Sequence, residues 1–492
     1  MGTSGFLLEP AHGVGAGMVY ASFIFHFAYA STATTIVSGA IAGRMKFSCY
    51  IIYAFFSSIF YGFPAHWVWS EGGFLQKYGF HDFAGCGPVH LFGACGAFYG
   101  ALCLGPRAGR FKPDGSRGEG VLAVYDPISV ICGFLMIWWG WIGFNCGSTF
   151  GSAGIKGTIA VRVGAVTVIA ACGGGVFTLI RIFFPKQLIK SLSASMKLKQ
   201  LDATATDAHP INAKKLNILN KIKRGLKQLR VDSNHVKVEE LTNAILSALV
   251  SITAACNCVN LRCSFLIGLF APPVTSSVNM LAEYYRIDDP VGAIGVHGAG
   301  GIYGLLCVGL FADTGLPGVL EYMPTLEKGI FLGGPISSLG RQIVGALMIT
   351  AWGMVSSFLI FSITSYILGG NRVSLEIEMD GIDVHEHEYD LIVTRGSEVG
   401  DLARRRRHAS IDARSRNSIT TLLEIQNQVM TKNQLHDNVN VHNEGGDDSN
   451  EDGQQVGLDL WSIITGDAGA GSNNSRNYND DDNTKGGDIE LR

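Results

Sequence analysis

Long apolar runs separated by short polar segments fill the chain up to about Leu368. A stretch of about 20 apolar residues is long enough to cross a bilayer as a helix, so the pattern predicts nine spans. They are Gly17–Ala42, Cys49–Trp69, Cys86–Leu104, Pro127–Gly147, Val163–Ile180, Ala244–Asn260, Ser264–Glu283, Val291–Phe311 and Gln342–Leu368. Asn257 and the Pro272-Pro273 pair interrupt the sixth and seventh spans, which predicts broken helices that face other protein rather than lipid. We therefore expect an all-α polytopic membrane protein.

Lysine and arginine are shared unequally between the predicted loops. One set of alternate loops is rich in them: Arg44 and Lys46; Arg107, Arg110, Lys112 and Arg117; the stretch from Arg181 to Lys237; and the tail. The other set holds little beyond Lys77, Lys156, Arg262 and Lys328. Because cytoplasmic loops carry the excess of basic residues, we place the first set and the C-terminus in the cytoplasm. Nine spans then put the N-terminus outside, and we expect the plasma membrane.

Two polar segments organise the chain into residues 1–185, a first transmembrane part; 186–237, a cytoplasmic basic insertion; 238–369, a second transmembrane part; and 370–492, a tail. In the insertion, apolar residues from Leu216 to Leu229 recur at helical spacing among lysines. This pattern fits either a basic amphipathic helix on anionic lipid or a solvated loop with some helix. Acidic low-complexity blocks predict that most of the tail is disordered, and Arg404–Arg407 before Ser410 suggests a kinase site.

Composition supports a membrane protein and argues against other classes. Only 16% of the residues are charged, against about 25% in soluble domains, which excludes an ordinary soluble enzyme. Basic and acidic residues are nearly balanced, 38 against 41, which excludes a generally basic nucleic-acid binder. The 11 Cys contain no Cys-x-x-Cys pair, so the sequence predicts no zinc site. We expect no cofactor, no metal and no enzymatic activity.

One short motif occurs twice. Asp82-Phe-Ala-Gly85-Cys-Gly-Pro-Val89-His90 enters the third span, and Asp289-Pro-Val-Gly292-Ala-Ile-Gly-Val296-His297 enters the eighth. Five spans separate the copies, so they are antiparallel, as in inverted-repeat transporters whose substrate site lies near the midplane between the halves. Ionisable groups within spans usually face the bundle interior, which predicts a pair formed by His90 and His297. The alternative is that each His only bonds a neighbouring helix.

Four aromatic residues lie toward the outer ends of spans in this topology: Phe25, Tyr29, Trp69 and Phe144. Aromatic faces attract cations, Trp best of all, so a cation could approach the histidines over them; the alternative is an interfacial aromatic belt or helix packing. The repeat also allows a count. The half that ends with the eighth span has five helices and its partner has three, so two helices are missing before Gly17.

These residues together resemble the ammonium transporter (Amt/Mep/Rh) family, on its Amt side. The resemblance runs from about Met18 to Tyr389, apart from the insertion. Its most specific pieces are Asp82-Phe-Ala-Gly85…His90, Gly143-Phe-Asn-Cys-Gly-Ser148, Ser38-Gly-Ala…Arg44-Met45 and Asp288-Asp-Pro…Val-His297-Gly. The early tail from Arg372 to His387 resembles the family's cytoplasmic regulatory strip. The resemblance implies a homotrimer of eleven-helix protomers, so that this chain lacks the first two helices, as a truncated gene product or with that part supplied from elsewhere.

The resemblance also implies site residues. Trp69 and Ser148 match the outer ammonium-recruiting site, Phe25 lines the same vestibule, and Asp82 matches an acidic residue that supports recruitment or the fold. Phe144 matches one ring of a stacked phenylalanine gate.

The partner position in that gate is Tyr29, a departure from the family, and His90 and His297 match its twin-histidine pore pair. The mechanism that we expect desolvates ammonium at the outer site, deprotonates it at the gate and passes ammonia along the histidines while a proton is relayed separately. The alternatives are an ammonium sensor, an Rh-like ammonia gas channel, a non-functional truncated paralogue and a haem-binding redox protein. Expected partners are ammonium or methylammonium, membrane lipids and two further copies of the chain, and no nucleic acid.

Overall fold

The computed structural model describes residues 16–112, 126–205, 237–382 and 385, and the side chains of residues 182–205 and 380 lie outside this description. Within it, all regular structure is helical apart from one isolated β-bridge between Met45 and Arg372. Eight helical stretches of the described chain are long and apolar enough to cross a membrane. The predicted all-α polytopic class is confirmed.

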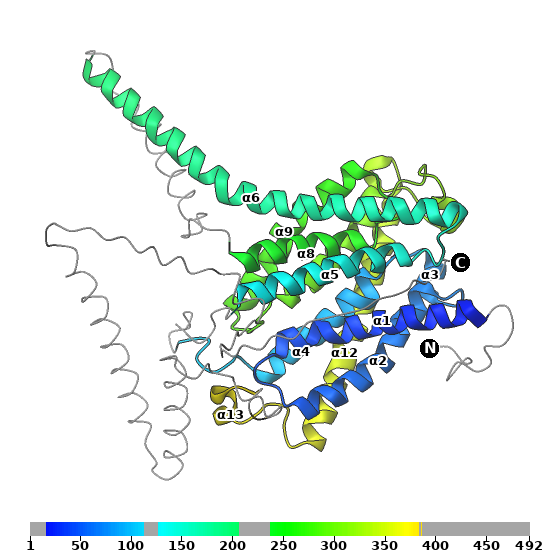
Figure 1. The fold of residues 1–492 in the computed structure, drawn as a ribbon. Helices are drawn as coiled ribbons and strands as arrows, with labels where there is room; N and C mark the ends of the chain where they lie inside the picture. Colours follow the sequence, from blue (N-terminus) through cyan, green and yellow to red (C-terminus); the bar gives the residue numbers. More distant parts are fainter. Residues whose placement is uncertain (1–15, 113–125, 206–236, 383–384, 386–492) are drawn as a thin grey trace, which may run out of the picture. The chain divides into compact units, whose positions relative to one another are not determined.

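The chain up to residue 112 forms one group of helices with the last long helix. Its elements are α1 (Ala16–Ile41), α2 (Phe47–Trp69), α3 (Phe74–Tyr78), the π-helical turn η2 (Cys86–Leu91), α4 (Phe92–Leu104) and α12 (Ile336–Ile367). In Figure 1, α2 and α4 lie beside α12, and α1 packs against α2 and α4.

The middle of the chain forms a second group. Its long helices are α5 (Pro127–Gly147), α6 (Gly154–Ala205), α8 (Val238–Thr253) and α9 (Leu261–Tyr284), with α6 packed on α8 and α9. The π-helical turn η3 (Ile294–Ala299) leads into α10 (Gly300–Phe311). Two short elements, α11 (Val319–Tyr322) and η4 (Ile330–Leu332), precede α12 in the chain, and a third, α13 (Leu375–Asp380), follows it. Since α4 contacts η3 and α10 contacts η2, the two groups meet at the two π-helical turns.

The structure corrects several predicted boundaries. The sixth span is wrong at its end, because α8 stops at Thr253 and residues 254–258 form buried turns. A helix of 16 residues is about 24 Å long, shorter than the hydrocarbon core of about 30 Å. The ninth span begins earlier than predicted, since α12 starts at Ile336. The boundary at residue 186 lies inside α6, which runs unbroken to Ala205.

The predicted break at Pro272-Pro273 is also wrong, because α9 continues through both prolines. A proline inside a helix removes the N–H that would bond the carbonyl four residues earlier. For Pro272 that residue is Gly268, which is packed directly against Ala170 of α6. Packing against a neighbouring helix makes such a helix tolerable within a membrane. The predicted amphipathic helix from Leu216 to Leu229, the tail beyond residue 385 and Ser410 lie outside the described residues.

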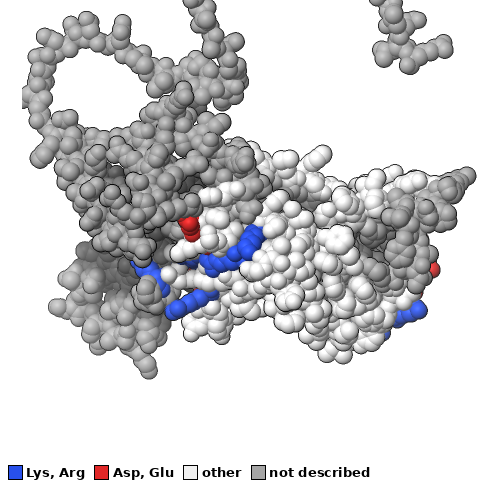
Figure 2. Space-filling view, turned by 90° about the horizontal axis from the view of Figure 1, so that it is seen from below, with Lys and Arg blue, Asp and Glu red and all other residues white. Residues whose placement is uncertain are grey.

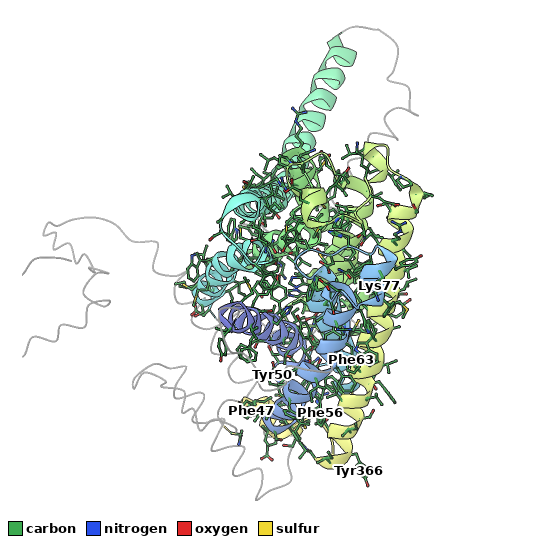
Figure 3. All side chains as sticks on the ribbon, turned by 90° about the vertical axis from the view of Figure 1, so that its right-hand side faces the viewer. Phe47, Tyr50, Phe56, Phe63, Lys77 and Tyr366 are labelled. Carbon is green, nitrogen blue, oxygen red and sulfur yellow. The ribbon has the colours of Figure 1, made fainter. Side chains whose placement is uncertain are left out.

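The surface of the described chain has the pattern of a membrane-embedded protein. Figure 2 shows Lys and Arg side chains gathered toward one end of the visible face, with a broad band free of charged side chains before the other end. Apolar side chains follow the outward face of α2 from Phe47 to Phe63 (Figure 3), and Phe55 on this helix is 65% exposed. A large exposed apolar face is costly in water but not in lipid.

Candidate functional site

Both copies of the repeated motif fold in the same way. The Asp82 carboxylate accepts hydrogen bonds from the backbone N–H groups of Gly85, Cys86 and Gly87 at 2.8, 3.0 and 2.7 Å. The Asp289 carboxylate accepts from Val291, Gly292 and Ile294 at 3.3, 3.0 and 2.7 Å. Each Asp thus supplies acceptors for the N–H groups that have no partner at a helix start.

The glycine at the fourth position of the motif has a conformational reason. Gly85 has φ of 104° and Gly292 has φ of 75°, values that side chains with a Cβ rarely adopt. The turn allows each Asp to reach forward to the next helix. Each helix then opens with a π-helical turn, Cys86–Leu91 or Ile294–Ala299, that contains the His. No pattern in the sequence indicated these π-helical turns, which are rare and occur mostly at functional sites.

The two turns bring the histidines together. The Nδ1 atoms of His90 and His297 lie 3.2 Å apart, and the ring centroids are 5.2 Å apart with 20° between the planes. An Nδ1–Nδ1 hydrogen bond needs one donor and one acceptor, so the two imidazoles must hold opposite tautomers. His90 is 1% exposed, and its Nε2 atom has no hydrogen-bond partner among the residues that the structure describes. The geometry therefore contains the pair that the antiparallel repeat predicts.

A column of aromatic rings leads away from this pair. Trp141 stacks on His90 with 5.0 Å between ring centroids and 8° between planes, and its Nε1 donates to Thr253 Oγ1 at 3.1 Å. Phe144 lies next, with its ring centroid 5.7 Å from that of His90. The sequence analysis did not single out Trp141. Its position three residues before Phe144, which puts both on one face of α5, was the available signal.

Tyr29 closes the column at the end away from the histidines. Its ring stacks on Phe144 with 4.0 Å between centroids and 20° between planes, and Tyr29 is only 2% exposed. The Tyr29 hydroxyl lies 2.7 Å from Ser148 Oγ and 3.0 Å from the carbonyl oxygen of Phe144. Ser148 Oγ in turn donates to the same carbonyl at 3.0 Å. The departure at Tyr29 thus adds polar contacts to a pair of stacked rings.

Beyond Tyr29 a cavity of about 800 Å³ opens, and Phe25, Tyr29, Trp69, Asp82 and Ser148 all line it. The ring centroid of Trp69 lies 5.7 Å from that of Tyr29, and Trp69 Nε1 donates to the Asp82 carbonyl oxygen at 2.8 Å. The structure therefore gathers all of the predicted outer-site residues in one vestibule. Residues that were not predicted to belong to the site also line it, among them His26, Lys77, Phe150, Lys156 and Tyr322.

Asp82 is occupied by the fold itself. Its carboxylate is bound by three backbone N–H groups and the residue is 3% exposed. Burial raises the pKa of Asp82 to about 6, although the three hydrogen bonds oppose the change. Of the two roles that the resemblance leaves open, the geometry fits support of the fold, with an indirect contribution to the vestibule through Trp69.

Comparison with known proteins assigns the chain to a family. The model of the family described as "Ammonium Transporter Family" matches residues 3–188 and 226–390. The chain belongs to the ammonium transporter family. It is 30% identical over 394 residues to a putative ammonium transporter 3 of Caenorhabditis elegans and 33% identical over 367 residues to a putative ammonium transporter of Synechocystis.

These alignments cover 79% and 74% of this chain, but the chain spans only 50% of the nematode relative and 67% of the cyanobacterial one. Among solved structures, one titled "Sensor Amt Protein" matches with a TM-score of 0.58 and 29% identity. That match covers 75% of this chain and 76% of the other.

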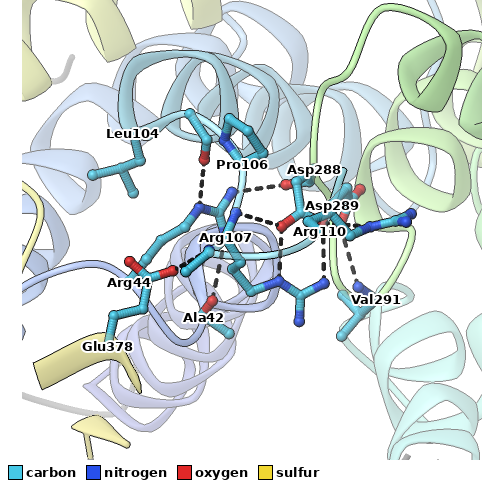
Figure 4. A network of polar contacts seen from close by, with 12 residues as sticks. Ala42, Arg44, Leu104, Pro106, Arg107, Arg110, Asp288, Asp289, Val291 and Glu378 are labelled. Atoms are coloured by element: carbon cyan, nitrogen blue, oxygen red, sulfur yellow. Dashed lines mark hydrogen bonds and ion pairs between the residues drawn. The ribbon is translucent and has the colours of Figure 1, made fainter. Parts of the chain in front are cut away.

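At the opposite end, this member of the ammonium transporter family carries a buried ionic network (Figure 4). The Asp288 side chain is fully buried and accepts from Arg107 Nε at 2.7 Å, the Arg107 backbone N at 2.9 Å and Arg110 Nε at 3.2 Å. Arg44, which is 0% exposed, donates to the Asp288 carbonyl oxygen at 2.7 Å and to the Gly105 carbonyl oxygen at 2.8 Å. Three loops that precede or follow spans are thereby joined.

The early tail joins the same network. Glu378 on α13 accepts from Arg372 Nη2 at 2.8 Å and from the backbone N of Ala108 at 2.7 Å. The backbone N of Val373 donates to the Arg44 carbonyl oxygen at 3.1 Å. These segments were predicted to share one side of the membrane, and they meet as that prediction requires. That this side is the cytoplasm stays a prediction.

Replacing Asp288 with Asn is expected to lower the free energy of unfolding by about 1.5–3 kcal/mol at pH 7, the range for hydrogen bonds to a charged group. Burial would raise the pKa of Asp288, but hydrogen bonds from Arg107 outweigh it and the pKa lies below its usual value. A depressed carboxyl pKa stabilises the fold above the unfolded-state pKa of about 4, and this contribution is lost as the pH falls through the folded-state pKa.

The check is thermal unfolding of the detergent-purified protein at pH 7 and at decreasing pH. The difference between wild type and Asp288→Asn should shrink below about pH 4. The control is Glu71→Gln. Glu71 is an exposed acid in the connection between α2 and α3, and this variant should differ little from wild type at any pH. A pH-independent difference for Asp288→Asn would contradict an ionised Asp288.

Proposed function

We propose that the chain carries ammonium across the plasma membrane, with ammonia passing along His90 and His297. The observation that carries this proposal is the unbroken sequence of contacts from the vestibule to the histidines. Trp69 faces Tyr29, Tyr29 stacks on Phe144, and Phe144 lies against His90. Each step has the chemistry that the next requires, and the family membership names ammonium as the substrate class.

At the outer end, water around the cation must be replaced. The Trp69 face offers a cation–π contact, and Ser148 Oγ offers a hydroxyl acceptor. Beyond Tyr29 and Phe144 lie His90 and Trp141, which are 1% and 6% exposed, and an isolated charge in such a buried place is costly. Ammonium can lower this cost by leaving its proton behind, whereas potassium, a cation of similar size, cannot. This difference supports selection by deprotonation.

The neutral histidine pair then offers hydrogen-bonding groups inside the bundle without a net charge. In the proposed mechanism, ammonia passes beside the pair while the proton is relayed separately. Retention of Trp69 together with both histidines favours an Amt-like carrier of charged ammonium over an Rh-like gas channel. We also propose a homotrimer with a cytoplasmic C-terminus, as the family resemblance implies. The strongly exposed apolar face of α5, with Trp139 81% and Met136 74% exposed, supports contact with lipid or another copy.

Replacing Trp69 with Leu is expected to raise the half-saturating concentration of ammonium by about 2- to 30-fold. This range corresponds to a cation–π contribution of about 0.5–2 kcal/mol. The measurement is the concentration dependence of ammonium-evoked current in cells that lack ammonium uptake of their own. Trp139→Leu, which removes an equally large ring from the exposed face of α5, is the matched control. Equal half-saturating concentrations in wild type and Trp69→Leu would count against recruitment at Trp69.

A second candidate is an ammonium sensor. The specific observation in its favour is the similarity to a solved structure titled "Sensor Amt Protein", together with a long segment after α13. Uptake of labelled methylammonium by the full chain and by a version that ends after residue 392 separates the two. A transporter gives substantial uptake in the full chain, whereas a sensor binds methylammonium with negligible flux in both.

A further inference from the structure

Three oxygen atoms at the floor of the vestibule form a closed triangle. Tyr29 Oη lies 2.7 Å from Ser148 Oγ and 3.0 Å from the Phe144 carbonyl oxygen, and Ser148 Oγ lies 3.0 Å from that carbonyl. Only two hydroxyl protons are available to the three atoms. With Ser148 donating to the carbonyl, Tyr29 donates to Ser148 Oγ or to the same carbonyl. The acceptor capacity of Ser148 Oγ is therefore shared with Tyr29 before any substrate arrives.

An ammonium-type cation presents only N–H donors. At Ser148 it needs a lone pair of Oγ, the atom that Tyr29 Oη approaches to 2.7 Å and to which the Tyr29 O–H can donate. Cation and tyrosine thus compete for one acceptor. Because both atoms of the pair lie in buried residues, Tyr29 at 2% and Ser148 at 6% exposure, water does not easily take the place of either donor.

The same tyrosine ring separates the vestibule from the histidines. It lines the 800 Å³ cavity on one side and stacks on Phe144 on the other, and Phe144 in turn contacts His90. For a substrate to pass, the Tyr29 ring must leave Phe144, and the hydroxyl at its tip must then leave Ser148 and the Phe144 carbonyl. Movement of the Tyr29 ring away from Phe144 therefore requires loss of the hydroxyl contacts, so the two changes are coupled.

We propose that Tyr29 is a substrate-displaced latch, in which an N–H group that binds Ser148 Oγ releases the Tyr29 hydroxyl and frees the ring to open. This inference rests on the proposed transport function and deepens it, since it makes occupancy of the outer site the trigger for the gate. The latch lowers the apparent affinity for the substrate, because only the fraction of protein with Ser148 unlatched is competent to bind.

The test is a double-mutant cycle on labelled methylammonium uptake with Tyr29→Phe, Ser148→Ala and both together. Tyr29→Phe keeps the stacked ring and removes only the competing donor. It should lower the KM by about two- to tenfold, the factor that corresponds to the loss of one hydrogen bond. In the Ser148→Ala background the same substitution should leave the KM unchanged, because no acceptor remains to compete for.

Tyr50→Phe is the control for removal of a tyrosine hydroxyl. Tyr50 lies on α2, and its hydroxyl donates to the Thr34 carbonyl oxygen at 3.4 Å rather than to a residue of the vestibule; the KM of this variant should equal that of wild type. Surface amounts are matched by labelling at the cell surface. An equal KM shift with Ser or Ala at position 148, or no shift at all, overturns the latch while leaving transport intact. A merely looser gate would raise the maximal rate without a KM change that depends on Ser148. Absence of uptake by wild type would instead refute the transport function.

Discussion

Replacing His297 with alanine is expected to abolish ammonium-evoked current. His297 and His90 hold each other through one Nδ1–Nδ1 contact of 3.2 Å. In the part of the chain that the structure describes, loss of His297 leaves His90 without a second imidazole in contact, and so without the group to which it passes a proton in the proposed mechanism. The current should fall to the level of cells without the protein, because the proton carries the charge in the proposed mechanism. The measurement is voltage-clamp recording of ammonium-evoked current.

His66→Ala is the matched control for this experiment. His66 lies on α2 outside the column of rings that leads to His90, and it should retain wild-type current. Cell-surface labelling confirms that both variants reach the membrane in equal amounts. An unchanged current in His297→Ala would refute the proton relay, whereas uncharged methylamine uptake without current would show that the pore remains open after the relay is lost.

The second large effect is expected for a glycine at the crossing of α6 and α9. A Cβ added at Gly268 would lie 1.9 Å from the carbonyl oxygen and 2.6 Å from the carbonyl carbon of Ala170. Both atoms belong to backbone and cannot move as a side-chain tip does, so Gly268→Ala must push the helices apart. We expect a loss of about 3 kcal/mol or more in the free energy of unfolding, at the upper end for overpacking substitutions.

Two quantities are measured: thermal unfolding of the protein in detergent, and the amount of protein that elutes as a single species. Gly140→Ala on α5 is the control, because nothing lies within 4 Å of the added Cβ. There the substitution should be neutral or stabilising by up to about 1 kcal/mol, the difference in helix propensity between the two residues. Equal stability for Gly268→Ala and wild type would contradict the close crossing.

The sequence predicted the parts of this fold that depend on repeated patterns. Apolar length located the spans, and the antiparallel motif anticipated that His90 and His297 would lie together. Prediction from the sequence was wrong at α8 and α9. A short buried helix and a proline-containing helix are both tolerated because of neighbouring helices, which no local sequence pattern reveals. The turns at residues 254–258 are apolar in sequence and buried in the structure, so they looked like more span.

The sequence indicated many residues of the candidate site, although not Trp141, but it did not indicate their hydrogen bonds. A tyrosine at position 29 was visible as a departure from the family, yet its contact with Ser148 spans 119 residues of sequence. Asp288 illustrates the same limit. Its neighbour Asp289 carries the repeated motif, whereas Asp288 holds two arginines from another loop, a difference that only the packing of α4 against the second group of helices determines.

The opposite tautomers that the Nδ1–Nδ1 contact requires would give the proposed pore a polarity that its inverted repeat lacks. One ring donates and the other accepts, so the hydrogen bond between them points either outward or inward. Transfer of a proton from one imidazole to the other reverses the direction of this hydrogen bond. A second proton can move in the same direction only after the original direction is restored by a second transfer or by reorientation of a ring. Net proton movement through this pair is therefore a cycle with a resetting step rather than a continuous flow, even where the protein scaffold itself does not move.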